Sequence, residues 1–89
     1  MAVSTIKPKM VVKSFSTGSF SANTYYATRT LDVSVDGLTA IGIVGYQVNQ
    51  AAAELYRLDL ENNTVTIGVS YSNQQNLNNV SVKVYVLYN

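Results

Sequence analysis

The segment spanning residues 38–48 constrains the fold more than any other part of this chain. Its apolar side chains occupy odd and even positions alike, whereas a strand with one solvent-exposed face alternates apolar and polar residues. Gly42 and Gly45 leave room for another backbone or subunit to approach closely. Both faces of this segment therefore need cover, which predicts either a central strand or an assembly surface.

The small size of the chain points toward the second of these roles. With 89 residues and no cysteine or histidine, the chain has no disulfide and lacks the usual zinc ligands. The core of so small a domain only about balances the entropy lost on folding, and oligomerisation is a common supplement. We therefore expect a homotrimer, whose predicted subunit interface consists of Ile41, Ile43, Val44 and Tyr46.

Charge and hydropathy exclude several classes of partner. Six basic and five acidic residues leave a net charge of +1, which is too weak a field for binding nucleic acid. The apolar stretches fall short of the roughly 20 residues that a membrane helix needs. The polar first nine residues lack the apolar core of a signal peptide. The sequence thus predicts synthesis in a cytoplasm without an export signal, and no membrane insertion.

Period-two alternation predicts β-structure for most of the chain. It is clearest in residues 64–71 and 80–88, and weaker patterns predict strands at residues 10–16 and 24–35. Asp36-Gly37 and Asn62-Asn63 are turn signals, the second of them closing a hairpin. Residues 51–60 contain helix-forming alanines, yet this hairpin requires a strand there. We predict an arm at residues 1–9, a loop at 72–79, and a single all-β domain at 10–89, a small antiparallel β-sandwich resembling a jelly roll.

The residues that usually carry catalysis are scarce. Without histidine or cysteine, the chain lacks the commonest general base and the best nucleophile. Asp32 and Asp36 are the closest aspartate pair. One lies at a predicted strand end and the other in a predicted turn, and these structural positions account for both residues without a catalytic role. A glycan-degrading enzyme would need carboxylates from distant strands, which no spacing favours. We therefore predict no catalytic residue, no metal site and no cofactor.

Seven tyrosines and an amide-rich segment are the features best suited to binding. Tyrosine offers a flat apolar ring with a polar tip, and amides offer paired donors and acceptors. For Tyr25, Tyr56 and Tyr85, packing in or beside the core is the favoured role. The predicted ligand contacts lie in or beside loops at one end of the sandwich, and comprise Tyr46, Gln47, Asn49, Tyr71, Asn73, Gln74 and Asn76.

Residues 24–88 also carry a resemblance to a known family. The run G-L-T-A-I-G-I-V-G at residues 37–45, the L-Y-R-L segment at 55–58, the Asn turn at 62–63 and the closing V-x-V-x-V-x-V-L-Y strand carry the pattern. Together they resemble the C-terminal β-sandwich tip modules of tail-fibre and receptor-binding proteins from phages and prophages of Gram-positive bacteria. Leu38 departs from this pattern, which often has tyrosine there. The resemblance implies a trimeric structural protein, and it assigns no binding residue.

The leading functional hypothesis is therefore a phage-type virion protein that contributes to host-surface attachment. Its expected partners are two further copies of the chain, other virion proteins and a cell-surface glycan. The alternative is a purely architectural virion component, such as a head fibre or capsid decoration protein, whose loops bind no ligand.

Overall fold

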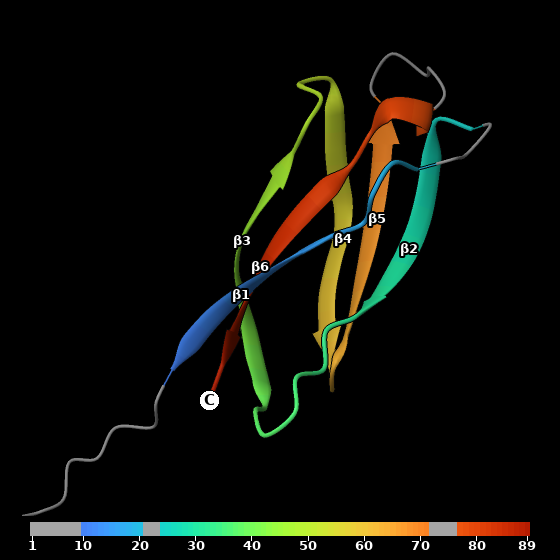
Figure 1. The fold of residues 1–89 in the computed structure, drawn as a ribbon. Coiled ribbons are helices and arrows are strands. Elements are labelled where there is room, and N and C mark those ends of the chain that lie inside the picture. Colours follow the sequence, from blue (N-terminus) through green and yellow to red (C-terminus); the bar gives the residue numbers. More distant parts are fainter. Residues whose placement is uncertain (1–9, 21–23, 72–76) are drawn as a thin grey trace, which may run out of the picture.

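The computed structural model describes residues 10–20, 24–71 and 77–89, and their fold is the predicted antiparallel β-sandwich (Figure 1). One three-stranded sheet, sheet A, has the order β1-β6-β3, and the other, sheet B, has the order β2-β5-β4. The elements are β1 (Val11–Ser16), β2 (Tyr26–Asp32), β3 (Ala40–Val48), β4 (Ala53–Glu61), β5 (Thr64–Tyr71), the short 3-10 helix η1 (Leu77–Asn79) and β6 (Val82–Tyr88).

The strand pairing is nested, as in a jelly roll. β1 pairs with β6 and β2 pairs with β5, so the chain folds back on itself around the corner that joins β3 to β4. The Asn62-Asn63 turn closes the β4–β5 hairpin, with Asn62 at a φ of 57°. The Asp36-Gly37 turn also forms, with the Leu38 amide donating to the Val35 carbonyl at 3.1 Å. It links sheet B to sheet A, because β2 and β3 do not pair.

The core lies between the two central strands, as their alternation predicts. In β5 the buried face carries Val65, Ile67 and Val69, and in β6 the valines at 82, 84 and 86 face them, all with no exposed surface. Phe20, Val33, Leu77 and Val80 add to this core from outside the strands. The predicted loop at residues 72–79 thus ends in a 3-10 turn whose leucine is fully buried.

Tyr88 joins the two sheets at the end of the core where the chain ends. Its side chain is completely buried, and its hydroxyl donates to the Val33 carbonyl oxygen, just beyond the end of β2. Burial raises the pKa of this phenol, and the nearby Asp32 carboxylate raises it further. Asp32 itself has a lowered pKa, because its carboxylate accepts hydrogen bonds from the hydroxyl and backbone amide of Ser34.

The raised pKa of Tyr88 predicts a loss of stability in alkali. In the unfolded chain this phenol ionises near its ordinary pKa of 10.0, whereas the folded protein retains the proton to a higher pH. The free energy of unfolding should therefore fall as the pH rises above 10.0, since proton release favours the unfolded state. Urea unfolding at stepwise higher pH tests this. Tyr88→Phe has no proton to lose there and should show a shallower fall, and equal slopes would contradict the prediction.

The apolar segment at residues 38–48 does not have the first of the two roles predicted for it. β3 is an edge strand of sheet A, so the expectation of a central strand is wrong. Two irregularities in its pairing with β6 place Ile41 and Val44 in β-bulges. Each bulge shifts the alternation by one residue, and the register therefore puts Ala40, Ile43 and Val48 on the inner face. The bulges therefore account for part of the apolar pattern, and the bulge residues Ile41 and Val44 remain exposed.

The alanine-containing segment forms a strand, as the hairpin argument predicts. β4 pairs with β5 along its whole length, and the irregularity between Leu55 and Arg57 makes Tyr56 a bulge residue. Tyr56 and Tyr25 are 53% and 40% exposed, so the expectation that they pack in or beside the core is wrong. Tyr85 is half-buried and lies on the outer face of sheet A.

Candidate functional site

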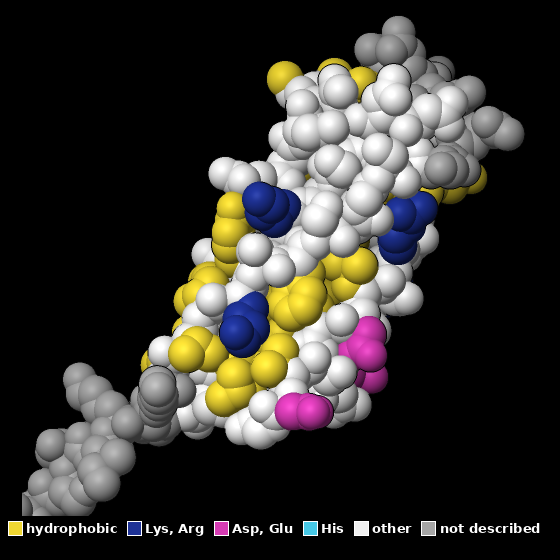
Figure 2. Space-filling view, in the orientation of Figure 1, with side chains coloured by type: hydrophobic (Ala, Val, Ile, Leu, Met, Phe, Trp, Pro, Cys, Tyr) yellow, Lys and Arg dark blue, Asp and Glu magenta, His cyan; other side chains and the backbone are white. Residues whose placement is uncertain are grey.

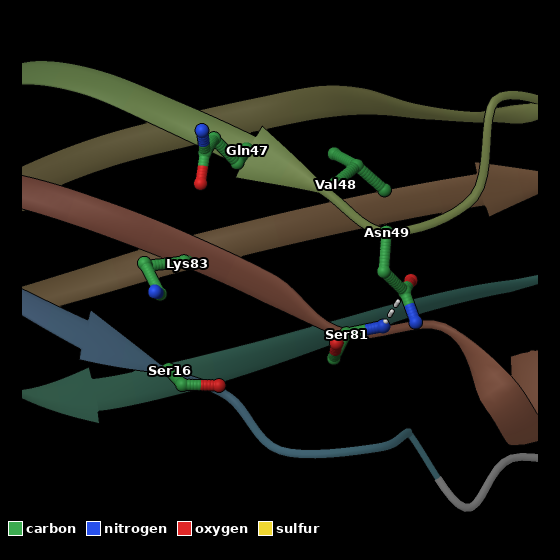
Figure 3. A pocket seen from close by; sticks show the side chains of 6 residues that line it. All are labelled: Ser16, Gln47, Val48, Asn49, Ser81 and Lys83. Atoms are coloured by element: carbon green, nitrogen blue, oxygen red, sulfur yellow. Dashed lines mark hydrogen bonds between the residues drawn. The ribbon is translucent and has the colours of Figure 1, made fainter.

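The candidate site is a polar cleft on the outer face of sheet A, at the end where β1 and β3 finish (Figure 3). A single cross-strand row forms its floor, because Lys83 of β6 pairs with Ser16 on one side and with Gln47 on the other. The cleft has a volume of about 420 Å³, and its remaining walls come from Val48, Asn49 and Ser81.

Asn49 and Gln47 are held in place by hydrogen bonds. The Asn49 side chain accepts from the Ser81 amide at 2.8 Å and donates to the Asn79 carbonyl oxygen at 2.8 Å. The Tyr85 hydroxyl donates to Oε1 of Gln47 at 3.0 Å, which leaves the amide group of Gln47 as a donor. The Tyr85 ring lies beside Gly45, where a Cβ atom would be in ordinary van der Waals contact with it at 3.6 Å. The cleft therefore presents preorganised amides.

Lys83 gives this cleft a positive charge. In the described part of the chain the only ion pair joins Arg57 to Asp59, so the Lys83 ammonium has no carboxylate partner there. The cleft lining contains no carboxylate. Ser16, one of its two serines, pairs in register with Lys83. The arrangement suits hydrogen bonding to an uncharged or anionic polar ligand.

The predicted ligand contacts are only partly brought together. Gln47 and Asn49 line the cleft. Tyr46 is exposed but pairs with the inward-facing Val84, so the register directs it away from Gln47. Tyr71 packs against the core, and its hydroxyl lies 3.4 Å from Oε1 of Gln50. The predicted contacts Asn73, Gln74 and Asn76 lie outside the described residues.

Sequence reasoning missed Lys83, Ser81 and Ser16 as cleft residues. Lys83 and Ser81 alternate with the core valines of β6, so their outward direction is readable from the sequence. The row that joins them to Ser16 depends on β6 lying between β1 and β3. That order arises from the nested pairing of strands far apart in the chain, which no local pattern encodes.

The four residues of the predicted subunit interface do not all lie on the surface. Ile41, Val44 and Tyr46 are 46%, 57% and 51% exposed. Ile43 faces inward and packs against the core instead. Three of the four residues therefore remain available for contact with another molecule.

Within the described residues, no group of three or more carboxylates could hold a metal ion. No helix in that part of the chain has the length and apolar character needed to cross a membrane. A scan against protein-family models, a search of curated proteins and a search of solved structures each gave no significant match.

Proposed function

We propose that the protein is a structural component of a phage-type virion, in which the sandwich forms a homotrimer through sheet A and contributes to host-surface attachment. The observation that carries this proposal is the unequal character of the two outer faces. Among the described residues, the exposed large aliphatic side chains all belong to β1, to β3 or to the residue before β1, namely Met10, Val12, Ile41 and Val44.

The outer face of sheet B has the opposite character. Four of the five carboxylates in the chain lie on it, at Asp32, Glu54, Asp59 and Glu61, all exposed and paired in register with serine or threonine of β5. Such a face is suited to remain in water, whereas exposed aliphatic groups favour burial in a contact. Figure 2 shows hydrophobic side chains gathered over the half of the molecule where β1 begins and β6 ends.

The polar cleft lies away from the most apolar part of sheet A. Ser16 stands four residues along β1 from Val12, a distance of about 13 Å. A trimer contact over Val12 and Ile41 therefore leaves the Lys83 row free to meet a cell-surface glycan. This division assigns assembly and attachment to different parts of one sheet.

The first test is the mass in solution. Static light scattering at micromolar concentration should give three times the 9.7 kDa chain mass. Val44→Lys should dissociate the trimer, because burying an unpaired charge in the contact costs about 3–5 kcal/mol. Thr30→Lys places the same charge on the outer face of sheet B and should leave the mass unchanged. A monomeric mass for the unmodified protein would overturn the assembly proposal.

The architectural alternative makes a different prediction for ligand binding. If the proposal holds, the unmodified trimer sediments with purified Gram-positive cell walls, and the double variant Gln47→Ala/Lys83→Ala loses this binding while its mass is unchanged. A trimer without affinity for any cell-wall fraction would favour the alternative of a head fibre or decoration protein.

A further inference from the structure

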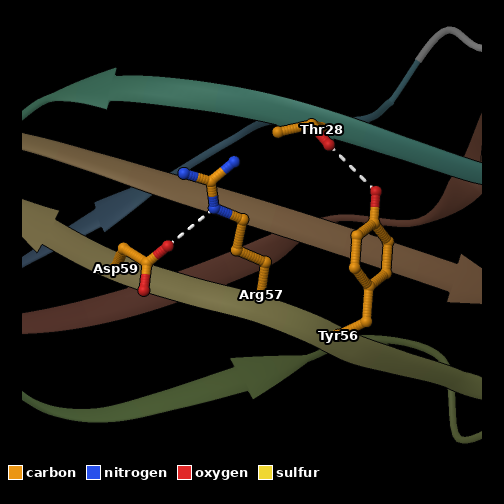
Figure 4. Close-up of polar contacts among 4 residues, drawn as sticks. All are labelled: Thr28, Tyr56, Arg57 and Asp59. Carbon is orange, nitrogen blue, oxygen red and sulfur yellow. Dashed lines mark hydrogen bonds and ion pairs between the residues drawn. The ribbon is translucent and has the colours of Figure 1, made fainter.

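A second surface, on the outer face of sheet B, carries a flat and exposed aromatic ring. The bulge in β4 turns Tyr56 across the central strand β5 toward β2 (Figure 4). The ring lies directly on Gly68, where a Cβ atom would stand only 2.6 Å from Cε1 and 2.7 Å from Cζ of the tyrosine. A ring can lie this close to the sheet only because residue 68 has no side chain.

Hydrogen bonds fix the far end of this ring. The Tyr56 hydroxyl lies 2.9 Å from the hydroxyl oxygen of Thr28 and donates to the Ala27 carbonyl oxygen at 3.3 Å. The residue nevertheless remains 53% exposed. One face of the ring is therefore covered by the sheet, while the other faces solvent in a fixed orientation. Little conformational entropy would be lost if a ligand stacked on it.

A polar depression on the same face begins at Arg57, the residue after Tyr56, and runs toward the Asn62-Asn63 turn. It has a volume of about 540 Å³, and its polar lining comprises Arg57, Asp59, Glu61, Asn62, Thr64 and Thr66. The side chain of Arg57 extends across β5 beside the tyrosine ring (Figure 4), and its Nε donates to Oδ2 of Asp59 at 2.6 Å. The guanidinium keeps further N–H donors and the carboxylate keeps further acceptor positions.

We propose that this surface is a saccharide-binding site for a neutral pyranose, with Tyr56 as the stacking platform. The C–H face of a pyranose ring is apolar and its rim carries hydroxyls, which matches an aromatic ring bordered by a guanidinium, a carboxylate and threonines. The four carboxylates of this face outnumber its single arginine, Arg57. This negative field disfavours saccharides that carry carboxylate or phosphate groups.

This site is distinct from the polar cleft, and it does not rest on the proposed virion function. Tyr56 and Gly68 belong to sheet B, whereas the cleft and the expected trimer contact belong to sheet A. Light scattering therefore tests the assembly proposal, and a sugar titration tests this one, so each can fail while the other holds.

The experiment is a titration of the nitrogen-15-labelled protein, followed by NMR, with the methyl β-glycosides of glucose, galactose and N-acetylglucosamine at millimolar concentrations. At least one should shift the amide signals of Tyr56, Arg57 and Gly68. Tyr56→Ala should weaken the binding of that glycoside at least about tenfold. Tyr56→Phe should keep most of the affinity, because the ring remains. Gly68→Ala should also weaken binding, because the new methyl group displaces the ring.

The matched control is Tyr46→Ala, which removes a tyrosine of similar exposure, 51%, from sheet A and should leave the affinity unchanged. Far-ultraviolet circular dichroism of each variant shows whether the fold is retained. Absence of shifts with all three glycosides, shifts confined to sheet A, or an equal loss in Tyr46→Ala would overturn the proposal. Tighter binding of methyl glucuronide than of the neutral glycosides would overturn the stated preference.

Discussion

Tyr88→Ala is expected to lower the free energy of unfolding by about 3–5 kcal/mol, the range for removing a large buried aromatic side chain. Tyr88 is fully buried, is the bulkiest residue of the core and lies 6.5 Å from the Phe15 ring, centroid to centroid. Its loss leaves a cavity between the sheets and an unpaired Val33 carbonyl oxygen. For a domain of this size the melting temperature should fall by roughly 15–30 °C.

Tyr88→Phe separates the hydrogen bond from the packing. It keeps the ring but leaves the same carbonyl oxygen without its donor, which costs about 1–3 kcal/mol. Thermal unfolding followed by circular dichroism measures both variants. A fall of less than about 5 °C for Tyr88→Ala would show that this end of the sandwich is not a cooperative part of the core.

Arg29→Ala should be the next most destabilising of the changes considered, by about 2–4 kcal/mol. Arg29 lies on the inward face of the edge strand β2, opposite Ile67. Its guanidinium donates to the Thr17 carbonyl oxygen at 2.8 Å and stands 4.5 Å from the centre of the buried Phe20 ring. A hydrogen bond from a charged donor contributes about 1.5–3 kcal/mol, and a cation–π contact about 0.5–2 kcal/mol.

This arginine ties the segment after β1 to sheet B. That segment is also held by hydrogen bonds from the Thr17 amide to the Val82 carbonyl oxygen, from the Val82 amide to the Thr17 hydroxyl, and from the Phe20 amide to the carbonyl oxygen of Val80, just before β6. In Arg29→Ala the amides of Thr17 and Phe20 should exchange hydrogen faster than those of β5. Arg29→Lys should recover less than half of the stability, because an ammonium lacks the planar fork. Full recovery in Arg29→Lys would mean that charge alone matters.

Local alternation was sufficient to predict most strands of this fold. In β5 and β6 the period of two is unbroken, since both strands are central and each has a fully buried face. The strand at Ala53–Glu61 was predicted against the helical preference of its alanines, because a hairpin partner was required. The pairing of strands that are neighbours in the sequence can therefore be predicted where one face is buried and the turn is recognisable.

The pattern failed where bulges interrupt the pairing. In β3 the residues that pack against the core, Ala40, Ile43 and Val48, are three and five positions apart, so a search for alternation finds apolar residues on both faces. In β4 the bulge places Tyr56 on the outer face, where an aromatic residue in a strand was expected to join the core. A bulge depends on how two strands accommodate each other, so neither strand shows it alone.

The candidate site was predictable only in part for a related reason. Gln47 and Asn49 were identified because their amides lie in or beside a predicted loop at one end of the sandwich. Lys83 reaches the same cleft because β6 lies between β1 and β3, and Ser16 follows from that order. The assignment of residues to a shared surface thus required the long-range topology.

The nested pairing also gives the sandwich two different poles. Val11 at the start of β1 pairs with Tyr88, and the Asn89 amide donates to the Thr39 carbonyl oxygen at 2.9 Å, so the beginning of β1 and the end of the chain lie together (Figure 1). Residues 17–20, 49–52 and 77–81 turn at the other pole. A carrier protein joined after Asn89 would therefore lie at the first pole and display the turns of the other pole outward, so copies immobilised through that end would present those turns to the solution.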